Sequence, residues 1–275
     1  MSNEGQDTES ESILPIDEHE EIVSEGGKNV RRRGVYLLPN LFTLAALFAG
    51  FYAVIAGMSG NFDEAGWAIL VAAVCDGLDG RIARLTGTQS AFGAEFDSLS
   101  DMVSFGVAPA LIIFSWGFAP LGQVGWAASF IYMSCAALRL ARYNVQLGTV
   151  DKRFFLGLQS PMAAGLVAGM PWVGFRYGIE VTPLVAYLCA ILTIFTGLLM
   201  ISNYKYFSFK ELNFKGTVPY MVFVFTIVLL VLIAQSPHEV LVLTCVIYAA
   251  SGPALSLIHI SEPTRRTPSS YAVFC

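Results

Sequence analysis

Charged residues are scarce in this chain, at 13% of its 275 residues, whereas about 25% of the residues in an average soluble domain are charged. Hydrophobic residues make up 55%, and the mean hydropathy is +0.61. This composition excludes an ordinary soluble domain, and the apolar runs are long enough for membrane-spanning helices rather than barrel strands. We therefore expect an all-α integral membrane protein. Its expected partner is the lipid bilayer, and no binding to nucleic acid is expected.

Cysteine and histidine are also rare, with five cysteines and three histidines in the whole chain. The cysteines are widely separated, and no CxxC pair or neighbouring histidine pair accompanies them. This pattern argues against a zinc site and against a disulfide framework, and it predicts buried free thiols. The sequence shows no internal repeat, and its first residues lack the basic and apolar regions of a signal peptide.

Charge and composition divide the chain into segments. Nine of the 21 acidic residues lie in residues 1–25, and we expect a disordered acidic tail over 1–27. A basic interfacial segment is expected over 28–35, then a transmembrane core over 36–215 and a C-terminal transmembrane hairpin over 216–256. Residues 257–275 change character abruptly and resemble a translated sequencing adapter, so we expect a non-native tail there.

Hydropathy predicts a polytopic bundle of eight membrane helices. If the N-terminus lies in the cytoplasm, all the basic residues except Arg176 fall on the cytoplasmic side, as the positive-inside rule requires. We therefore expect a multi-pass protein with a cytoplasmic N-terminus. The expected helices cover residues 36–58, 64–86, 91–117, 120–145, 159–178, 182–203, 218–235 and 238–256.

Four aspartates interrupt the second and third of these helices, namely Asp76, Asp79, Asp97 and Asp101. A carboxylate at bilayer depth costs about 2.5 kcal/mol or more, so such residues usually serve a function. Asp79 and Asp97 are equidistant from residue 88, and Asp76 and Asp101 nearly so, which places all four at one depth in a helical hairpin. Because side chains at i,i+3 and i,i+4 share a helix face, we expect the four carboxylates to converge.

Converging carboxylates repel one another unless protons or cations lie among them. Ligation by oxygen alone favours hard cations such as Mg²⁺, Mn²⁺ or Ca²⁺, and two divalent cations would balance four carboxylates. Arg84 adds a side chain that can bind a phosphate group. We therefore expect a site for a phosphorylated ligand that enters from the cytoplasm. Small residues that let a ligand or backbone approach closely line the same hairpin: Gly77, Gly80, Ala83, Gly87 and Gly93.

The pattern Asp76-x2-Asp79-Gly80-x2-Ala83-Arg84-x8-Gly93-x3-Asp97-x3-Asp101 resembles the signature of the CDP-alcohol phosphotransferases. The resemblance implies a membrane enzyme with a six-helix core, usually a homodimer, that transfers a phosphatidyl group from a CDP-linked lipid to an alcohol and releases CMP. It also implies two divalent cations, Mg²⁺ or Mn²⁺, held by Asp76, Asp79 and Asp97 and faced by Asp101, which is the candidate general base. Gly80, Ala83 and Gly93 would give room to the cytidine nucleotide, which Arg84 would contact.

Further segments resemble the bacterial, membrane-embedded members of this family that make phosphatidylserine. They are LLPNLFTLAALFAGFYA, LRLARYNV, FFLGLQSPMAAG and LLMISNYKYFSFK; one departure is Gln159, where a proline is expected. This resemblance implies CDP-diacylglycerol and L-serine as substrates, phospholipid biosynthesis as the role, and the bacterial cytoplasmic (inner) membrane as the location, with the active site facing the cytoplasm.

Several polar residues outside the signature have two interpretations. Asn40 and Thr43 either contact the cytidine or begin and cap the first helix. Arg139 and Arg142 either hold the lipid phosphate or the serine carboxylate, or anchor the fourth helix on the cytoplasmic side. Two further residues, Asn144 and Ser160, either orient serine or cap helices.

Two other functions stay open at this point. The same chemistry could use another alcohol, glycerol 3-phosphate or inositol phosphate, although acceptors that carry a phosphate should require more basic residues on the cytoplasmic side. Intramembrane acids also mark cation and proton transporters. Transporters, however, often carry paired repeats with interrupted helices, and none is evident here.

Overall fold

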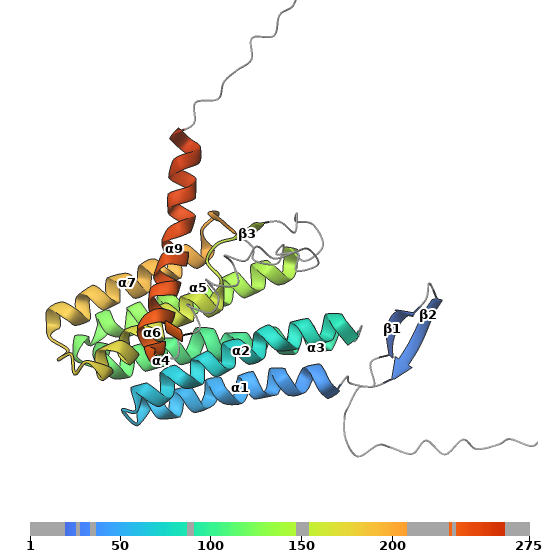
Figure 1. Ribbon diagram of the computed structural model, residues 1–275, viewed down its shortest axis with the longest axis horizontal. Helices are drawn as coiled ribbons and strands as arrows, with labels where there is room; N and C mark the ends of the chain where they lie inside the picture. The colour runs from blue at the N-terminus through green and yellow to red at the C-terminus, as the bar shows by residue number, and fades with distance from the viewer. Residues whose placement is uncertain are drawn as a thin grey trace, which may run out of the picture.

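The computed structural model describes residues 20–25, 28–33, 37–86, 91–146, 154–207, 231–232 and 235–261. Helices dominate these residues and lie side by side in a bundle (Figure 1). Among the described residues, four segments are long and apolar enough to cross a membrane: Asn40–Met58, Phe92–Leu121, Gln123–Val145 and Pro183–Ile201. The helical membrane class expected from composition is confirmed. The helix expected over 218–235 lies almost entirely outside the described residues.

The first two helices, α1 (Leu37–Met58) and α2 (Phe62–Thr86), form a hairpin that closes at residues 59–61. Gly60 has a φ of 81° in this turn, a conformation that suits glycine. Alanines fill much of the buried contact in this part of the bundle, and small side chains let two backbones approach closely. The hairpin sets the carboxyl-terminal half of α2, which carries the first two aspartates, beside the start of α1.

The expected helix over 91–117 is present, but it is not a uniform α-helix. It consists of α3 (Ala91–Asp101), a π-helical segment η1 (Met102–Val107), α4 (Ala108–Ile113), a second π-helical segment η2 (Phe114–Phe118) and a 3₁₀ turn η3 (Ala119–Leu121). Wider π turns often occur at functional sites, and η1 begins directly after Asp101.

Serine hydroxyls of this interrupted helix donate hydrogen bonds to backbone carbonyls of α1. Ser100 donates to the carbonyl of Thr43 at 3.1 Å, and Ser104 donates to the carbonyl of Ala46 at 3.0 Å. Ser115 donates to the Gly57 carbonyl at 3.0 Å. Interhelical hydrogen bonds of this kind help to hold helices together in membranes, and here they fix the height of α3 against α1.

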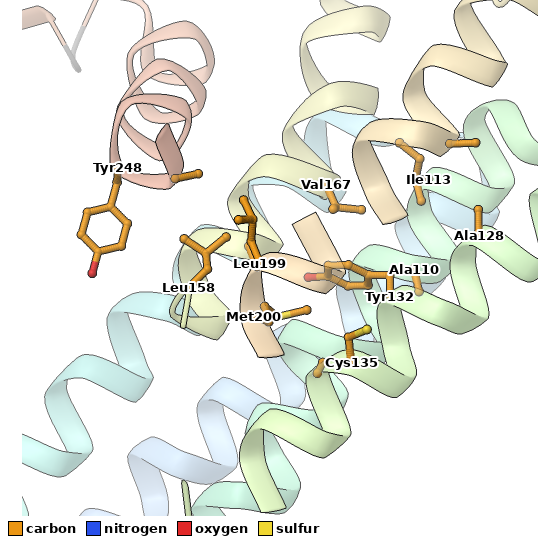
Figure 2. Packing of buried hydrophobic residues seen from close by; sticks show 14 of the residues in the cluster. Ala110, Ile113, Ala128, Tyr132, Cys135, Leu158, Val167, Leu199, Met200 and Tyr248 are labelled. Carbon is orange, nitrogen blue, oxygen red and sulfur yellow. The ribbon is translucent and has the colours of Figure 1, made fainter. Parts of the chain in front are cut away.

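Three further helices complete the core: α5 (Gln123–Gln146), α6 (Ser160–Arg176) and α7 (Pro183–Ile201). Each lies where hydropathy predicts it, at 120–145, 159–178 and 182–203. Figure 2 shows part of the buried cluster that they share, with Tyr132 among Val167 and Met200. The Tyr132 hydroxyl is fully buried and donates to the Phe105 carbonyl at 2.9 Å, so this polar group keeps a partner inside the core.

Two short antiparallel strand pairs correct the all-helical prediction. Strand β3 (Phe154–Leu156) pairs with β4 (Lys205–Phe207), and β1 (Glu20–Glu25) pairs with β2 (Lys28–Arg33). The β3–β4 pair joins the connections that follow α5 and α7, and it supplies hydrogen bonds to backbone groups outside the helices. Strand β1 falls where composition predicts disorder, so this part of the chain corrects that expectation.

The C-terminal helix α9 (Pro237–Ser261) crosses the bundle, and its final part extends away from the other helices (Figure 1). It covers the helix expected at 238–256 and continues past residue 256. Its contact with α6 depends on small residues: a Cβ atom at Gly165 would lie 2.7 Å from the Cys245 sulfur. Four cysteines in the described residues carry free thiols, as predicted: Cys75, Cys135, Cys189 and Cys245.

Candidate active site

Three of the four intramembrane aspartates meet between α2 and α3. Asp76 comes from α2, Asp97 and Asp101 come from α3, and one carboxylate oxygen from each lies within 4.8 Å of the others. All three side chains are half-buried. The antiparallel course of the two helices and the i,i+4 spacing on α3 produce this meeting. Three hard oxygen ligands at such separations can share one divalent cation.

Asp79 lies close by but has a different partner. Its side chain is buried, and its Oδ2 accepts a hydrogen bond from the Thr43 hydroxyl on α1 at 2.8 Å. Asp79 and Asp97 remain within electrostatic range of each other. The hairpin spacing predicts convergence of all four carboxylates, whereas the structure turns Asp79 toward α1, because α1 offers a buried hydroxyl donor beside it.

The carboxyl groups of this cluster lie close enough to affect one another's charge. Asp101 lies within electrostatic range of Asp76 and Asp97, and its carboxyl group is in hydrogen-bonding contact with that of Asp76. Two carboxyl groups can make such a contact only if they share a proton, or if a cation replaces it. Arg139, from α5, lies within electrostatic range of Asp101. Three carboxylates at this separation can be balanced by the charge of a divalent cation.

Two glycines of α2, Gly77 and Gly80, are not explained by packing. A Cβ atom added to Gly77 or Gly80 would meet nothing within 4 Å in the part of the chain that the structure describes. Both glycines are exposed, and Ala83 is half-buried one turn farther along. Arg84 is also exposed, and its Nε donates to the Gly80 carbonyl at 2.8 Å. Since glycine weakens a helix by roughly 1 kcal/mol relative to alanine, an open glycine face suggests close approach of a ligand.

Arg139 has a connection to α6. Its Nη1 donates to the hydroxyl of Ser160, a fully buried residue at the start of α6. The Nε of Arg139 is buried and has no hydrogen-bond acceptor among the described residues. Because buried N–H groups almost always have partners, this orphaned donor indicates a position where a bound ligand or water accepts a hydrogen bond.

Arg142 has a structural role in this conformation. Its Nη1 donates to the Ile201 carbonyl at 3.1 Å, and its Nη2 donates to Asn203 Oδ1 at 2.7 Å. These bonds join the end of α5 to the end of α7. The structure therefore separates two arginines that the sequence treats alike: Arg139 points into the interior near the aspartates, and Arg142 ties two helix ends together.

Two asparagines and Gly93 complete the set of predicted residues. Asn144 Nδ2 donates to the Ser98 hydroxyl at 3.0 Å, beside Asp97. Asn40 lies one turn before Thr43 on α1, and its Nδ2 is buried without a partner among the described residues. Gly93 is half-buried on α3, one turn before Asp97. Sequence reasoning missed Ser98 and Ser100; the run of hydroxyls between Asp97 and Asp101 was the signal for them.

Comparisons with known proteins match this part of the chain. A family model described as CDP-alcohol phosphatidyltransferase covers residues 36–195, which include α1, all four aspartates, Arg139 and Ser160. A Helicobacter pylori protein named CDP-diacylglycerol–serine O-phosphatidyltransferase is 36% identical over 219 residues, 79% of this chain and 90% of that protein. Proteins of the same name from Methanocaldococcus jannaschii and Mycobacterium leprae are 38% and 34% identical, covering 67% and 74% of this chain and 80% and 68% of their own lengths.

Proposed function

The chain belongs to the CDP-alcohol phosphatidyltransferase family, and we propose that it transfers the phosphatidyl group of CDP-diacylglycerol to the hydroxyl of L-serine, giving phosphatidylserine and CMP. The observation that carries this proposal is the meeting of Asp76, Asp97 and Asp101 inside the matched segment, at the depth of a membrane helix pair. The names of the similar proteins indicate serine as the acceptor. A transporter function is not retained, since the family match accounts for the buried acids.

We propose that two divalent cations, Mg²⁺ or Mn²⁺, bind at this cluster, with Asp76, Asp79, Asp97 and Asp101 as ligands. Three oxygens within 4.8 Å of one another and a carboxyl pair in direct contact fit such ions. Bound cations would neutralise the diphosphate and stabilise the CMP leaving group. Asp79, held by Thr43, would reach the ions from the side of α1.

The positions of the other site residues in the structure support a proposed role for each of them. Asp101 is the general base that would accept the proton of the serine hydroxyl, and Arg139 lies within electrostatic range of its carboxyl group. The glycine face of α2 lies open to the nucleotide. The groups that would surround the cytidine and its phosphates are Asn40, Thr43, Gly80, Ala83, Arg84 and Gly93. Arg139 and Ser160 would hold the acceptor, while Arg142 and Asn144 support them through their bonds to Ile201 of α7 and Ser98 of α3.

The charge near Asp101 favours L-serine over an acceptor alcohol that carries a phosphate group. Arg139 is the cation beside Asp101 in the described part of the chain, and one guanidinium matches one carboxylate in a bidentate pair. Glycerol 3-phosphate or inositol phosphate brings a dianionic group and would need further cations nearby. The acceptor site as described therefore suits the carboxylate of an amino acid.

The proposal is tested by CMP release from CDP-diacylglycerol with each alcohol in turn, Mg²⁺ or Mn²⁺ being supplied. We expect release with L-serine and little with glycerol 3-phosphate or inositol phosphate. Release with glycerol 3-phosphate but not with serine would keep the family chemistry and overturn the acceptor.

We further propose that the enzyme is a homodimer of chains with eight membrane helices each, located in the bacterial cytoplasmic membrane with the N-terminus and the active site facing the cytoplasm. The basic residues near α5 and β4 support this orientation. In the same proposal residues 36–215 form the catalytic core, 216–256 a C-terminal hairpin, and 257–275 a non-native tail.

A further inference from the structure

Ser100 of α3 is a buried polar residue to which the proposed reaction gives no task. It stands between the two aspartates of that helix, and only 2% of its surface is exposed. Its hydroxyl donates to the Thr43 carbonyl of α1 at 3.1 Å. Burying a hydroxyl costs free energy unless the group is hydrogen-bonded. The bond to Thr43 supplies that partner, and it joins α3 to α1 beside the aspartates.

Thr43 continues this connection to α2. Its own hydroxyl donates to Oδ2 of Asp79 at 2.8 Å, and both residues are 3% exposed. Ser100, Thr43 and Asp79 therefore form an unbroken series of buried hydrogen bonds across three helices. One residue of α1 holds α3 through its carbonyl and α2 through its hydroxyl. Since α3 carries Asp97 and Asp101, the series relates the position of Asp79 to those two carboxylates.

The separation of Asp79 from the carboxylates of α3 matters for a metal site. Mg²⁺ requires ligand oxygens at about 2.0–2.1 Å in a nearly ideal octahedron, and such sites need their side chains held to within about 0.5 Å. Asp79 is not one of the three aspartates whose oxygens already lie within 4.8 Å of one another. Its approach to a shared cation therefore depends on the groups that hold it, and these are on α1.

We propose that Ser100 is a positioning residue for the metal site: through Thr43 it holds Asp79 at a fixed separation from the aspartates of α3. This proposal rests on the proposed function, which places divalent cations among these carboxylates. In this role Ser100 contacts neither cation nor substrate. Thr43 has two tasks, because its carbonyl receives the bond from α3 and its hydroxyl makes the bond to α2.

Ser104 provides a matched control in the same pair of helices. It is fully buried, and its hydroxyl donates to the Ala46 carbonyl of α1 at 3.0 Å, one turn beyond Ser100. The carbonyls of Thr43 and Ala46 both lie within α1, so each keeps its helical partner when a serine hydroxyl is removed. We therefore expect Ser100→Ala and Ser104→Ala to lower the melting temperature by similar amounts.

Binding of Mn²⁺ to the detergent-solubilised full chain tests the proposal without relying on turnover; the paramagnetic resonance signal of free Mn²⁺ reports it. For Ser100→Ala we expect the Kd for Mn²⁺ to rise about threefold to tenfold, as the loss of one hydrogen bond predicts. For Ser104→Ala we expect a change of less than twofold. In a Thr43→Val background the bond to Asp79 is already lost, so Ser100→Ala should add less than twofold.

The outcomes separate this proposal from the proposed function. If Mn²⁺ binds but Ser100→Ala leaves the Kd unchanged, or Ser104→Ala raises it equally, the positioning role is overturned. A full effect of Ser100→Ala in the Thr43→Val background contradicts it as well. CMP release by the unaltered protein decides the proposed function independently, and an unaltered protein that binds no Mn²⁺ overturns the metal site and the positioning role together.

A second variant covers the case in which Ser100→Ala does not fold. Ser100→Cys nearly keeps the size of the side chain and offers only a weak donor. We expect its Kd for Mn²⁺ to rise in the same direction, and a Kd equal to that of the unaltered protein would contradict the positioning role.

Discussion

At the residue scale, the clustered carboxylates differ in what else surrounds them. Asp101 lies beside both its fellow aspartates and Arg139, and it stands where the straight α-helix gives way to the π-helical η1. Asp79 is set apart by its bond to Thr43. In the proposed mechanism Asp101 would meet both the acceptor and the cations, while the Thr43 hydroxyl of α1 holds Asp79.

The substitution Asp101→Asn tests the role of general base. The amide keeps the size of the side chain and one oxygen but cannot accept the proton of serine, so we expect turnover to fall by about 10²–10⁴-fold. Binding of CDP-diacylglycerol, measured by equilibrium dialysis with a labelled nucleotide, should change far less. A variant with near-native turnover would show that another group removes the proton.

The substitution Thr43→Val tests whether Asp79 is positioned from α1. Removing the hydroxyl leaves the buried Asp79 carboxylate without this donor, and loss of such a supporting bond typically weakens a metal site by about 10–100-fold. We expect the Mg²⁺ concentration for half-maximal activity to rise accordingly. Thr43→Ser keeps the hydroxyl and serves as the control. Equal metal dependence in Thr43→Val and Thr43→Ser would contradict this role.

The sequence predicts part of this residue-level arrangement. Symmetry about residue 88 and helical spacing are sufficient to bring Asp76, Asp97 and Asp101 together. The orientation of Asp79 could not be predicted, because it depends on a hydroxyl from another helix. The hydrogen bond from Arg139 to Ser160 could not be predicted either, because it joins two helices whose packing no local sequence pattern specifies.

At the scale of the elements, helix positions follow closely from hydropathy, since apolar runs and their polar ends mark where helices begin and end. The predicted helix 36–58 corresponds to α1 at Leu37–Met58, and 182–203 to α7 at Pro183–Ile201. The π-helical segments η1 and η2 have no such signal, because a π turn alters spacing without altering composition. The strand pair β3–β4 was missed because each strand is short and its partner lies far along the chain.

Two glycines of α2, Gly66 and Gly77, allow a matched test. One is expected to be needed for helix packing and the other for the approach of a ligand. A Cβ atom at Gly66 would lie 2.2 Å from Trp172 Cδ2, whereas one at Gly77 would meet nothing within 4 Å among the described residues. We expect Gly66→Ala to lower the free energy of unfolding by about 1–3 kcal/mol through overpacking. Gly77→Ala should leave the fold as stable or slightly more so and should still reduce activity.

Thermal unfolding and CMP release, measured on both variants in the same detergent, check this pair of expectations. Full activity in Gly77→Ala would show that no ligand approaches the open face of α2. Unchanged stability in Gly66→Ala would show that α2 and α6 can separate without cost.

At the scale of the whole molecule, the two ends of the bundle differ in character. The aspartates, Arg139 and the β3–β4 pair gather toward one end. Toward the other end, Trp172 donates to Asp63 at 2.8 Å and packs edge to face on Trp67. Aromatic side chains at that level are typical of a membrane interface. A reaction centre at one end suits an enzyme that takes one substrate from the bilayer and the other from water.

The central claim is that the aspartate cluster transfers a phosphatidyl group to serine with the help of divalent cations. The most direct measurement is incorporation of labelled L-serine into lipid by the purified protein in vesicles that contain CDP-diacylglycerol. The account predicts that label enters phosphatidylserine, that excess chelator abolishes incorporation, and that Mg²⁺ or Mn²⁺ restores it. Undiminished incorporation in excess chelator, or no incorporation with either metal present, would contradict it.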